Sequence, residues 1–294
     1  MLYTRRDIGR LAIAAGATTG VLAAKPNSKF GGVQIGAITY SFRALPGSAE
    51  EILKYCVDCG ISAVELMSGA AELYAGAPPM SGKPTPEAIK AWRLSVSMDK
   101  YKAFRKMYED AGVKIYCFKL PPTLAMSDEE YEYIWNVAQT LGANHITMEL
   151  PANDELLRRV AAFAGKRKLN IAFHTHGQGG ASGFDKVLGA SKYTALNFDV
   201  GHYYGVNGES PVPLIEKYHD RIASLHLKDR KGPPNGANMP WGQGGTPLTE
   251  VLQLMKKNKY KFPASIEYEY NTPEGSDVLT EMKKCVAYCK KALA

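Results

Sequence analysis

The segment Leu196-Asn-Phe-Asp-Val-Gly-His202 and the later segment Ser224-Leu-His-Leu-Lys-Asp229 decide the fold of this chain. Each is an apolar run whose last residues turn polar, which is typical of a buried strand that ends at a site. Two more segments follow the same pattern, Ile171-Ala-Phe-His-Thr-His176 and Ser265-Ile-Glu-Tyr-Glu-Tyr270. Core packing alone does not explain potential metal ligands at four strand ends. The pattern therefore predicts a metal site where parallel strands end together.

Strand-like and helix-like segments alternate through the rest of the chain. Strands are predicted at residues 34–39, 63–66, 113–119, 145–150, 170–174, 195–200, 222–228 and 264–268. Helical patterns separate them, with a Pro- and Gly-containing insertion at 68–97 and a Gly- and Pro-rich loop at 231–245. Eight such units predict an α/β fold of the (β/α)8 TIM barrel type. The alternative is a doubly wound open sheet, but no Gly-rich phosphate loop follows the first strand, which argues against a dinucleotide fold.

Composition agrees with one globular domain that has a substantial core. The chain has 294 residues, 45% of them hydrophobic, and a formal net charge of +7. Lys and Arg are scattered through the predicted helices, and no basic run is interleaved with aromatic residues. The charge is therefore interpreted as a solvated face, and no nucleic-acid partner is expected.

The first 24 residues are predicted to lie outside the barrel. Arg5 and Arg6 form a twin-arginine pattern, and an Ala- and Gly-rich apolar stretch follows at 11–24. This stretch is too short for a stable membrane span and resembles an export leader cleaved near Ala24. Residues 1–24 are thus predicted to be a signal peptide and 25–294 a single barrel domain, exported to the periplasm. An uncleaved N-terminal anchor is the alternative.

The five cysteines leave two interpretations open. Cys56 and Cys59 lie on the first predicted helix, and Cys285 and Cys289 lie one turn apart on the last. First and last helices are neighbours in a closed barrel, so a disulfide between the pairs is possible in an oxidising compartment. The favoured interpretation is that all five, including Cys117, are small buried hydrophobic residues.

The metal site is predicted to use one ligand from each of four strand ends. In a parallel barrel these ends share one rim, so His174, Asp199, His226 and Glu267 are expected to bind a single divalent cation. Two imidazoles and two carboxylates favour Mn²⁺, Zn²⁺ or Co²⁺ over Ca²⁺.

The spacing Asp199-x-x-His202 and His226-x-x-Asp229, with a Glu on the last strand, resembles the xylose isomerase-like barrel superfamily. That superfamily includes ketose 3-epimerases, hydroxypyruvate isomerase, inosose dehydratase and endonuclease IV. The resemblance covers essentially all of residues 25–294 and implies that Asp199, His226 and Glu267 bind the metal, while His202 faces the substrate. An endonuclease is not expected, because a trinuclear site needs further His ligands on early strands and none precedes His145.

The fifth strand departs from the epimerase pattern. Ketose 3-epimerases have a Glu there that serves as ligand and as one of two bases, whereas this chain has His174, with His176 on the same strand face. An imidazole nitrogen that binds a metal is not also a free base. The His-x-His arrangement is similar to that of inosose dehydratase-like members.

Other polar residues near strand ends are candidates for catalysis or substrate binding. The predicted acid–base residues are Glu267, His176, His202, Glu149 and Glu269. Those predicted to bind substrate are Glu65, Lys119, Lys228 and Trp241, the last by stacking on a sugar ring. For Glu65 and Lys119 the alternative is a buried ion pair.

Three functions compete at this stage. The first is a metal-dependent sugar isomerase or epimerase that acts on a keto-sugar through an enediolate. The second is a lyase or dehydratase that eliminates water or an aglycone from a 3-keto-sugar or keto-cyclitol, beside a separate sugar oxidoreductase. The third is a non-catalytic carbohydrate-binding barrel. Family frequency favours the first, the histidine on the fifth strand favours the second, and an intact ligand set argues against the third.

Overall fold

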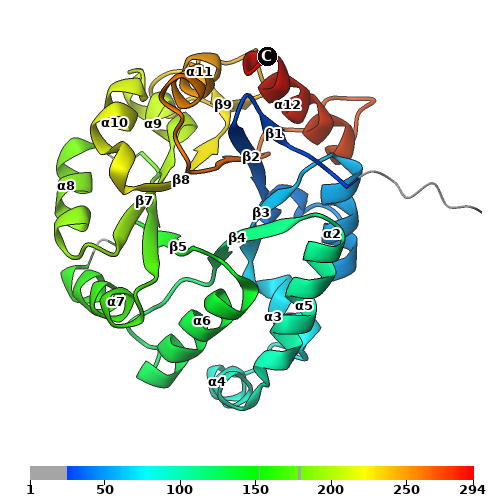
Figure 1. Cartoon of the computed structure of the whole chain (residues 1–294), viewed down its shortest axis with the longest axis vertical. Coiled ribbons are helices and arrows are strands. Elements are labelled where there is room, and N and C mark those ends of the chain that lie inside the picture. The colour runs from blue at the N-terminus through cyan, green and yellow to red at the C-terminus, as the bar shows by residue number, and fades with distance from the viewer. Residues whose placement is uncertain (1–24, 152, 178–179) are drawn as a thin grey trace, which may run out of the picture.

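Parallel strands form the centre of the molecule and close on themselves. The computed structural model describes residues 25–151, 153–177 and 180–294. Within them the barrel strands are β2 (Val33–Ile38), β3 (Ala63–Met67), β4 (Lys114–Lys119), β5 (His145–Glu149), β6 (Asn170–His174), β7 (Thr194–Asp199), β8 (Ile222–Leu227) and β11 (Ala264–Ile266). β11 pairs in parallel with both β8 and β2, so the sheet closes. The predicted eight-stranded barrel is confirmed (Figure 1).

Helices surround the barrel as an outer ring (Figure 1). They are α2 (Ala49–Asp58), α5 (Met98–Asp110), α6 (Asp128–Leu141), α7 (Asp154–Arg167), α8 (Ala181–Gly189), α10 (Val212–Tyr218), α11 (Leu248–Asn258) and α12 (Val278–Ala292). The helix α2 shows why these segments are helical. Its N-cap Ser48 and its third residue Glu51 form a capping box, and its buried residues Ile52, Leu53 and Cys56 recur at helical spacing.

Polar side chains inside the barrel form hydrogen bonds with one another. Tyr116 on β4 contacts the hydroxyl of Ser265 on β11 across the interior. His145 Nε2 lies 3.0 Å from the hydroxyl of Ser224 on β8. His145 is therefore a structural residue of the core, because both of its ring nitrogens have partners there.

Four segments have more regular structure than the sequence indicated. The insertion after β3 contains α3 (Ser68–Ala75), a short turn of helix at Met80–Gly82 and α4 (Pro86–Ser95). The helix α9 (Val200–Asn207) begins directly after β7, and β9 (Asp229–Arg230) pairs with β10 (Asn238–Met239) as a hairpin in the Gly- and Pro-rich loop. A strand β1 (Lys29–Phe30) pairs antiparallel with β2.

All five cysteines are buried and none is in a disulfide, which agrees with the favoured interpretation. The predicted leader at residues 1–24 lies outside the described residues. Among the helices that the structure describes, none is long and apolar enough to cross a membrane.

Candidate metal centre

The structure brings together the four residues that the sequence proposed as ligands. His174 ends β6, Asp199 ends β7, His226 lies near the end of β8, and Glu267 directly follows β11. One ligand atom from each lies within 4.8 Å of all the others. None of the four is more than 6% exposed. The four residues form a candidate cation site on the carboxyl-terminal rim of the barrel.

Asp199 shows most directly that the cluster fits a cation. It is the N-cap of α9, and its Oδ1 accepts a hydrogen bond from the His202 backbone N–H at 2.7 Å. Its buried Oδ2 accepts no hydrogen bond from the described residues, and its charge is paired with the Lys228 ammonium at 3.1 Å. Oδ2 lies 4.0 Å from His174 Nε2 and 4.0 Å from His226 Nδ1. Ligand atoms bound to one ion at about 2.1 Å lie at most about 4.2 Å apart, and both of these distances are below that limit.

A buried relay orients both imidazoles. His174 Nδ1 lies 2.8 Å from Asn197 Oδ1, and the Asn197 amide donates to Glu65 Oε2 at 2.9 Å. His226 Nε2 lies 2.8 Å from the same Glu65 oxygen. With those nitrogens engaged, His174 directs Nε2 toward the cluster and His226 directs Nδ1 toward it. His226 Nδ1 donates to Glu267 Oε2 at 2.7 Å and would release this proton on binding a cation.

Glu65 and Asn197 therefore have roles that the sequence did not assign. Glu65 was expected to bind substrate hydroxyls, but its carboxylate is fully buried behind His226 and also accepts a hydrogen bond from Thr147. The expectation of a buried ion pair describes its place better. Asn197 was not singled out, although it lies two residues before Asp199 on the same strand face, which was the available signal.

Opposite charges balance inside the cluster. Despite burial, Glu65 and Glu267 raise the pKa of His226 to about 10. Despite burial, Lys228 and His226 hold the pKa of Glu267 well below its usual range. Burial, aided by the charge of His226, lowers the pKa of His174 well below its usual range, which leaves a neutral imidazole able to bind a metal.

Lys228 lies within the cluster rather than at its edge. Its ammonium is 3.1 Å from Asp199 Oδ2, 2.8 Å from Glu267 Oε2 and 2.6 Å from Glu269 Oε2. The side chain is almost fully buried. Lys228 and Glu269 thus face the ligands directly, in a position to contact a substrate bound there.

A more open group lies beside the ligands at the ends of β4, β5 and β6. Glu149 Oε1 is 3.0 Å from the Lys119 ammonium, and Glu149 Oε2 is 3.2 Å from His176 Nδ1. The side chains of Glu149 and His176 are 46% and 48% exposed. The His176 ring lies against the His202 ring, with centroids 4.5 Å apart. Glu149 and His176 are therefore accessible to a substrate next to the metal cluster, while the Lys119 side chain, 11% exposed, is largely buried.

Comparison with known proteins identifies the family. The sequence model described as "Xylose isomerase-like TIM barrel" matches residues 53–288. This chain belongs to that family. The expected resemblance is confirmed at the level of family and fold.

Curated relatives in this comparison are inosose dehydratases. One from Clostridium botulinum (strain Eklund 17B / Type B) is 27% identical over 134 residues, which cover 38% of this chain and 45% of that protein. One from Bacillus thuringiensis (strain Al Hakam) is 26% identical over 128 residues, which cover 42% of this chain and 37% of that protein. The chain thus matches less than half the length of these relatives.

Solved structures share the family fold at lower sequence identity. A probable 3-DHS dehydratase from Bacillus anthracis superposes with a TM-score of 0.64 and 16% identity, over 87% of this chain and 99% of that one. A D-psicose 3-epimerase superposes with a TM-score of 0.61 and 13% identity, over 89% and 99%. At these identities the likeness concerns the fold alone.

The Gly- and Pro-rich loop after β8 includes the segment Gly242-Gln243-Gly244, and Asp229 holds this loop in place. Its carboxylate accepts hydrogen bonds from the backbone N–H groups of Gly242, Gly244 and Thr246. Trp241 in this loop packs edge-on against Tyr288 of α12, with ring centroids 5.5 Å apart. The predicted sugar-stacking residue is therefore half-buried against the closing helix.

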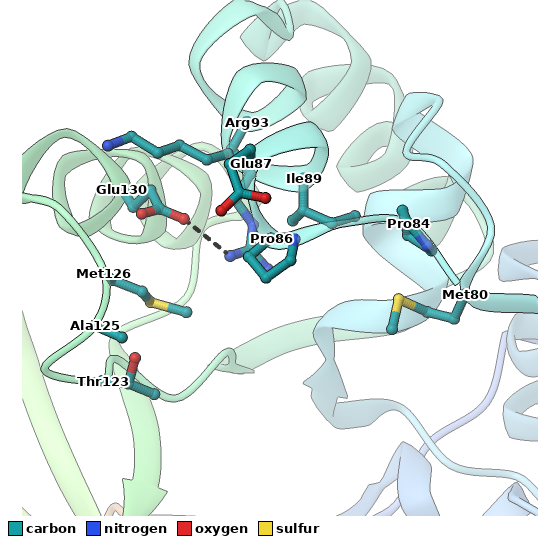
Figure 2. Close-up of a pocket in the computed structure, with 11 residues that line it drawn as sticks. Met80, Pro84, Pro86, Glu87, Ile89, Arg93, Thr123, Ala125, Met126 and Glu130 are labelled. Carbon is teal, nitrogen blue, oxygen red and sulfur yellow. Dashed lines mark ion pairs between the residues drawn. The ribbon is translucent and has the colours of Figure 1, made fainter. Parts of the chain in front are cut away.

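A separate cleft of about 530 Å³ opens between α4 and the loop that follows β4. In Figure 2, Met80 and Pro84 lie on one side of it and Ala125 and Met126 on the other. The Arg93 guanidinium in its wall is paired with Glu130 at 3.5 Å (Figure 2). None of the predicted site residues lines this cleft.

Proposed function

We propose that this protein is a metal-dependent lyase that eliminates water, or another oxygen-linked group, from a keto-sugar or keto-cyclitol. The observation that carries this proposal is His174 at the end of β6. Its Nδ1 is engaged with Asn197, so only Nε2 faces the cluster and this position supplies a ligand but no base. Curated relatives named inosose dehydratase support the same reaction class.

Each ligand has a defined part in binding the cation. His174, Asp199, His226 and Glu267 would hold one divalent ion, of which Mn²⁺, Zn²⁺ and Co²⁺ suit the donor set. Such an ion polarises a ketone and its neighbouring hydroxyl, and so acidifies the hydrogen on the adjacent carbon. The relay through Asn197 and Glu65 keeps the two imidazoles in the orientation that this requires.

Glu149 and His176 supply the proton transfers on one side of the substrate. Glu149 takes the proton from the carbon next to the ketone, and the electron pair of that C–H bond forms the new carbon–carbon double bond. The bond to the leaving oxygen on the next carbon breaks, and His176 donates the proton that this oxygen needs. The reaction yields an unsaturated ketone and water or an alcohol. Both groups lie together beside the ligands, 3.2 Å apart.

An isomerase or epimerase is the second candidate, and one observation favours it. Glu149 is the last residue of β5, and Glu267 directly follows β11. These two strands lie on opposite sides of the closed eight-stranded barrel. Two carboxylates that face a substrate from opposite sides can remove a proton and return it to the other face. In this case the product keeps the mass of the substrate.

The two reactions are distinguished by mass. The Mn²⁺-loaded enzyme is incubated with ketoses, 3-keto-glucosides and keto-cyclitols in deuterated water. Elimination produces a product lighter by one water or one alcohol, and Glu149→Gln abolishes it while the exposed control Glu155→Gln does not. A product of unchanged mass that carries deuterium on carbon would refute the lyase in favour of the epimerase. Binding without turnover of any compound would refute both.

The proposed substrate class implies a preceding reaction, and the predicted leader concerns a separate question, the location of the enzyme. A keto-sugar is formed from a sugar by oxidation of one hydroxyl, so a separate sugar oxidoreductase must supply the substrate. The twin-arginine pattern at Arg5 and Arg6 supports export of the folded protein to the periplasm.

A further inference from the structure

We propose that Arg230 is a positioning residue that fixes the tautomer of His202, so that His202 carries its proton on Nε2 and directs that N–H into the metal cluster. The tautomer itself does not depend on the reaction catalysed. Its use, as a hydrogen-bond donor to a substrate oxygen, rests on the proposed function. Arg230 is absent from the predicted site residues and lies outside the ligand set.

The Arg230 guanidinium is held rigidly beside His202. Nη1 lies 2.6 Å from His202 Nδ1, Nε donates to the Gly236 carbonyl at 2.9 Å, and Nη2 donates to the Asn235 side chain at 3.0 Å. The side chain is 5% exposed. A Cβ at Gly205 on α9 would lie 3.1 Å from the guanidinium carbon, so a glycine permits this close approach. A guanidinium only donates, so Nδ1 must accept if this contact is a hydrogen bond.

Lys228 competes for the other nitrogen of the same ring. Its ammonium lies 3.0 Å from His202 Nε2, and it too only donates. A neutral imidazole accepts through one nitrogen, so one of the two cations must lack a proton acceptor at His202. The Lys228 ammonium donates to Glu269 Oε2 at 2.6 Å and is paired with Glu267 Oε2 at 2.8 Å and Asp199 Oδ2 at 3.1 Å, and anions attract its protons more strongly than an imidazole does. The partners of Arg230 are all neutral, so His202 Nδ1 is the acceptor that Arg230 uses.

This assignment settles what Nε2 is able to do. A neutral His202 ring whose Nδ1 accepts from Arg230 carries its one proton on Nε2 and has no free lone pair for a cation, so His202 acts as a donor even though His174, His176 and His202 form a second geometric cluster. The Nε2–H group lies 4.0 Å from Asp199 Oδ2, at the edge of the candidate cation site. There it donates to a substrate oxygen that approaches the ligands, as a neutral polarising group.

The tautomer is measured directly by NMR. Protein labelled with ¹⁵N-histidine, free of metal and then loaded with Zn²⁺, is studied by long-range ¹H–¹⁵N correlation, and His202 is assigned by its loss in His202→Gln. We expect Nδ1 to resonate in the unprotonated range and Nε2 in the protonated range. In Arg230→Met we expect the Nε2–H tautomer to lose its preference, whereas His145 keeps its wild-type signals. The opposite tautomer in the wild-type protein would overturn the proposal, and this result does not depend on the folding of Arg230→Met.

A second readout separates positioning from a purely structural role. Arg230→Met should retain the wild-type metal content and lose about a hundredfold in kcat/KM, the lower range for loss of one donor to developing charge. Arg230→Lys should recover the tautomer only where its ammonium reaches Nδ1, and activity should follow the tautomer across the variants. Activity that falls while the tautomer is unchanged would refute the positioning role. Failure of the lyase proposal would leave the tautomer result intact, so the two outcomes are distinguishable.

Discussion

Asp199 combines two tasks, and two substitutions separate them. Oδ1 caps α9 by accepting the His202 N–H, while the buried Oδ2 faces the candidate cation site without a hydrogen-bond partner among the described residues. Asp199→Asn keeps an oxygen for the cap and removes the anionic ligand. Asp199→Ala removes both. Asn and Asp are about equally good N-caps, whereas Ala at an N-cap costs about 1 kcal/mol.

The expected magnitudes follow from this division. Both variants should bind metal at least about a hundredfold more weakly, or about 3 kcal/mol, because loss of a ligand exceeds the effect of losing an outer-shell partner. The free energy of unfolding of the metal-free protein should differ between the two, with Ala about 1 kcal/mol below Asn. Metal affinity is measured by competition with a chromophoric chelator, and stability by denaturant titration after removal of metal.

Asp277 provides a matched control, because it caps α12 through Thr280 and is outside the ligand set. Asp277→Ala should leave metal affinity unchanged. Wild-type affinity in Asp199→Asn would refute the metal site, and equal stability of Asp199→Asn and Asp199→Ala would refute the separate capping role.

Two further predictions test residues around the site, and a third tests the predicted export leader. Asn197→Ala should weaken metal binding about tenfold to a hundredfold, because His174 loses the partner that orients its ring. The control Asn207→Ala should leave metal binding unchanged, because the Asn207 amide donates to the Tyr203 carbonyl within α9. Burial lowers the pKa of His145 from 6.5 to about 4, so the unfolded chain gains a proton as pH falls through 6.5 while the folded chain stays neutral until about 4. Between pH 6.5 and about 4, the free energy of unfolding of the wild-type protein should therefore fall by about 3 kcal/mol more than that of His145→Gln. Denaturant titration at a series of pH values measures both, and an equal pH dependence of the two proteins would contradict the prediction. Replacement of Arg5 and Arg6 by Lys should retain precursor in the cytoplasm, as shown by fractionation, and equal export of both forms would exclude the leader.

Part of the site was predictable because of what parallel strands do. Their carboxyl ends meet on one rim, so polar residues at the ends of four apolar runs were expected to converge, and His174, Asp199, His226 and Glu267 do so. The Asp199-x-x-His202 spacing also contains the cap of α9, since an N-cap side chain reaches the N–H three residues on. Yet the sequence did not predict the helix α9 at residues 200–207, because its glycines and tyrosines form no amphipathic pattern.

The sequence by itself determined the barrel, the family and the four convergent ligands, because these depend on strand periodicity and on which residues end each strand. Only the tertiary structure decided which nitrogen each imidazole directs at the cluster. That choice depends on Glu65, which is 132 residues from Asn197 and 161 from His226 along the chain. The proposed tautomer of His202 rests in the same way on the Arg230 guanidinium, 2.6 Å from His202 Nδ1. Such contacts join residues that are far apart in the sequence and share no local pattern, so the sequence alone does not predict them.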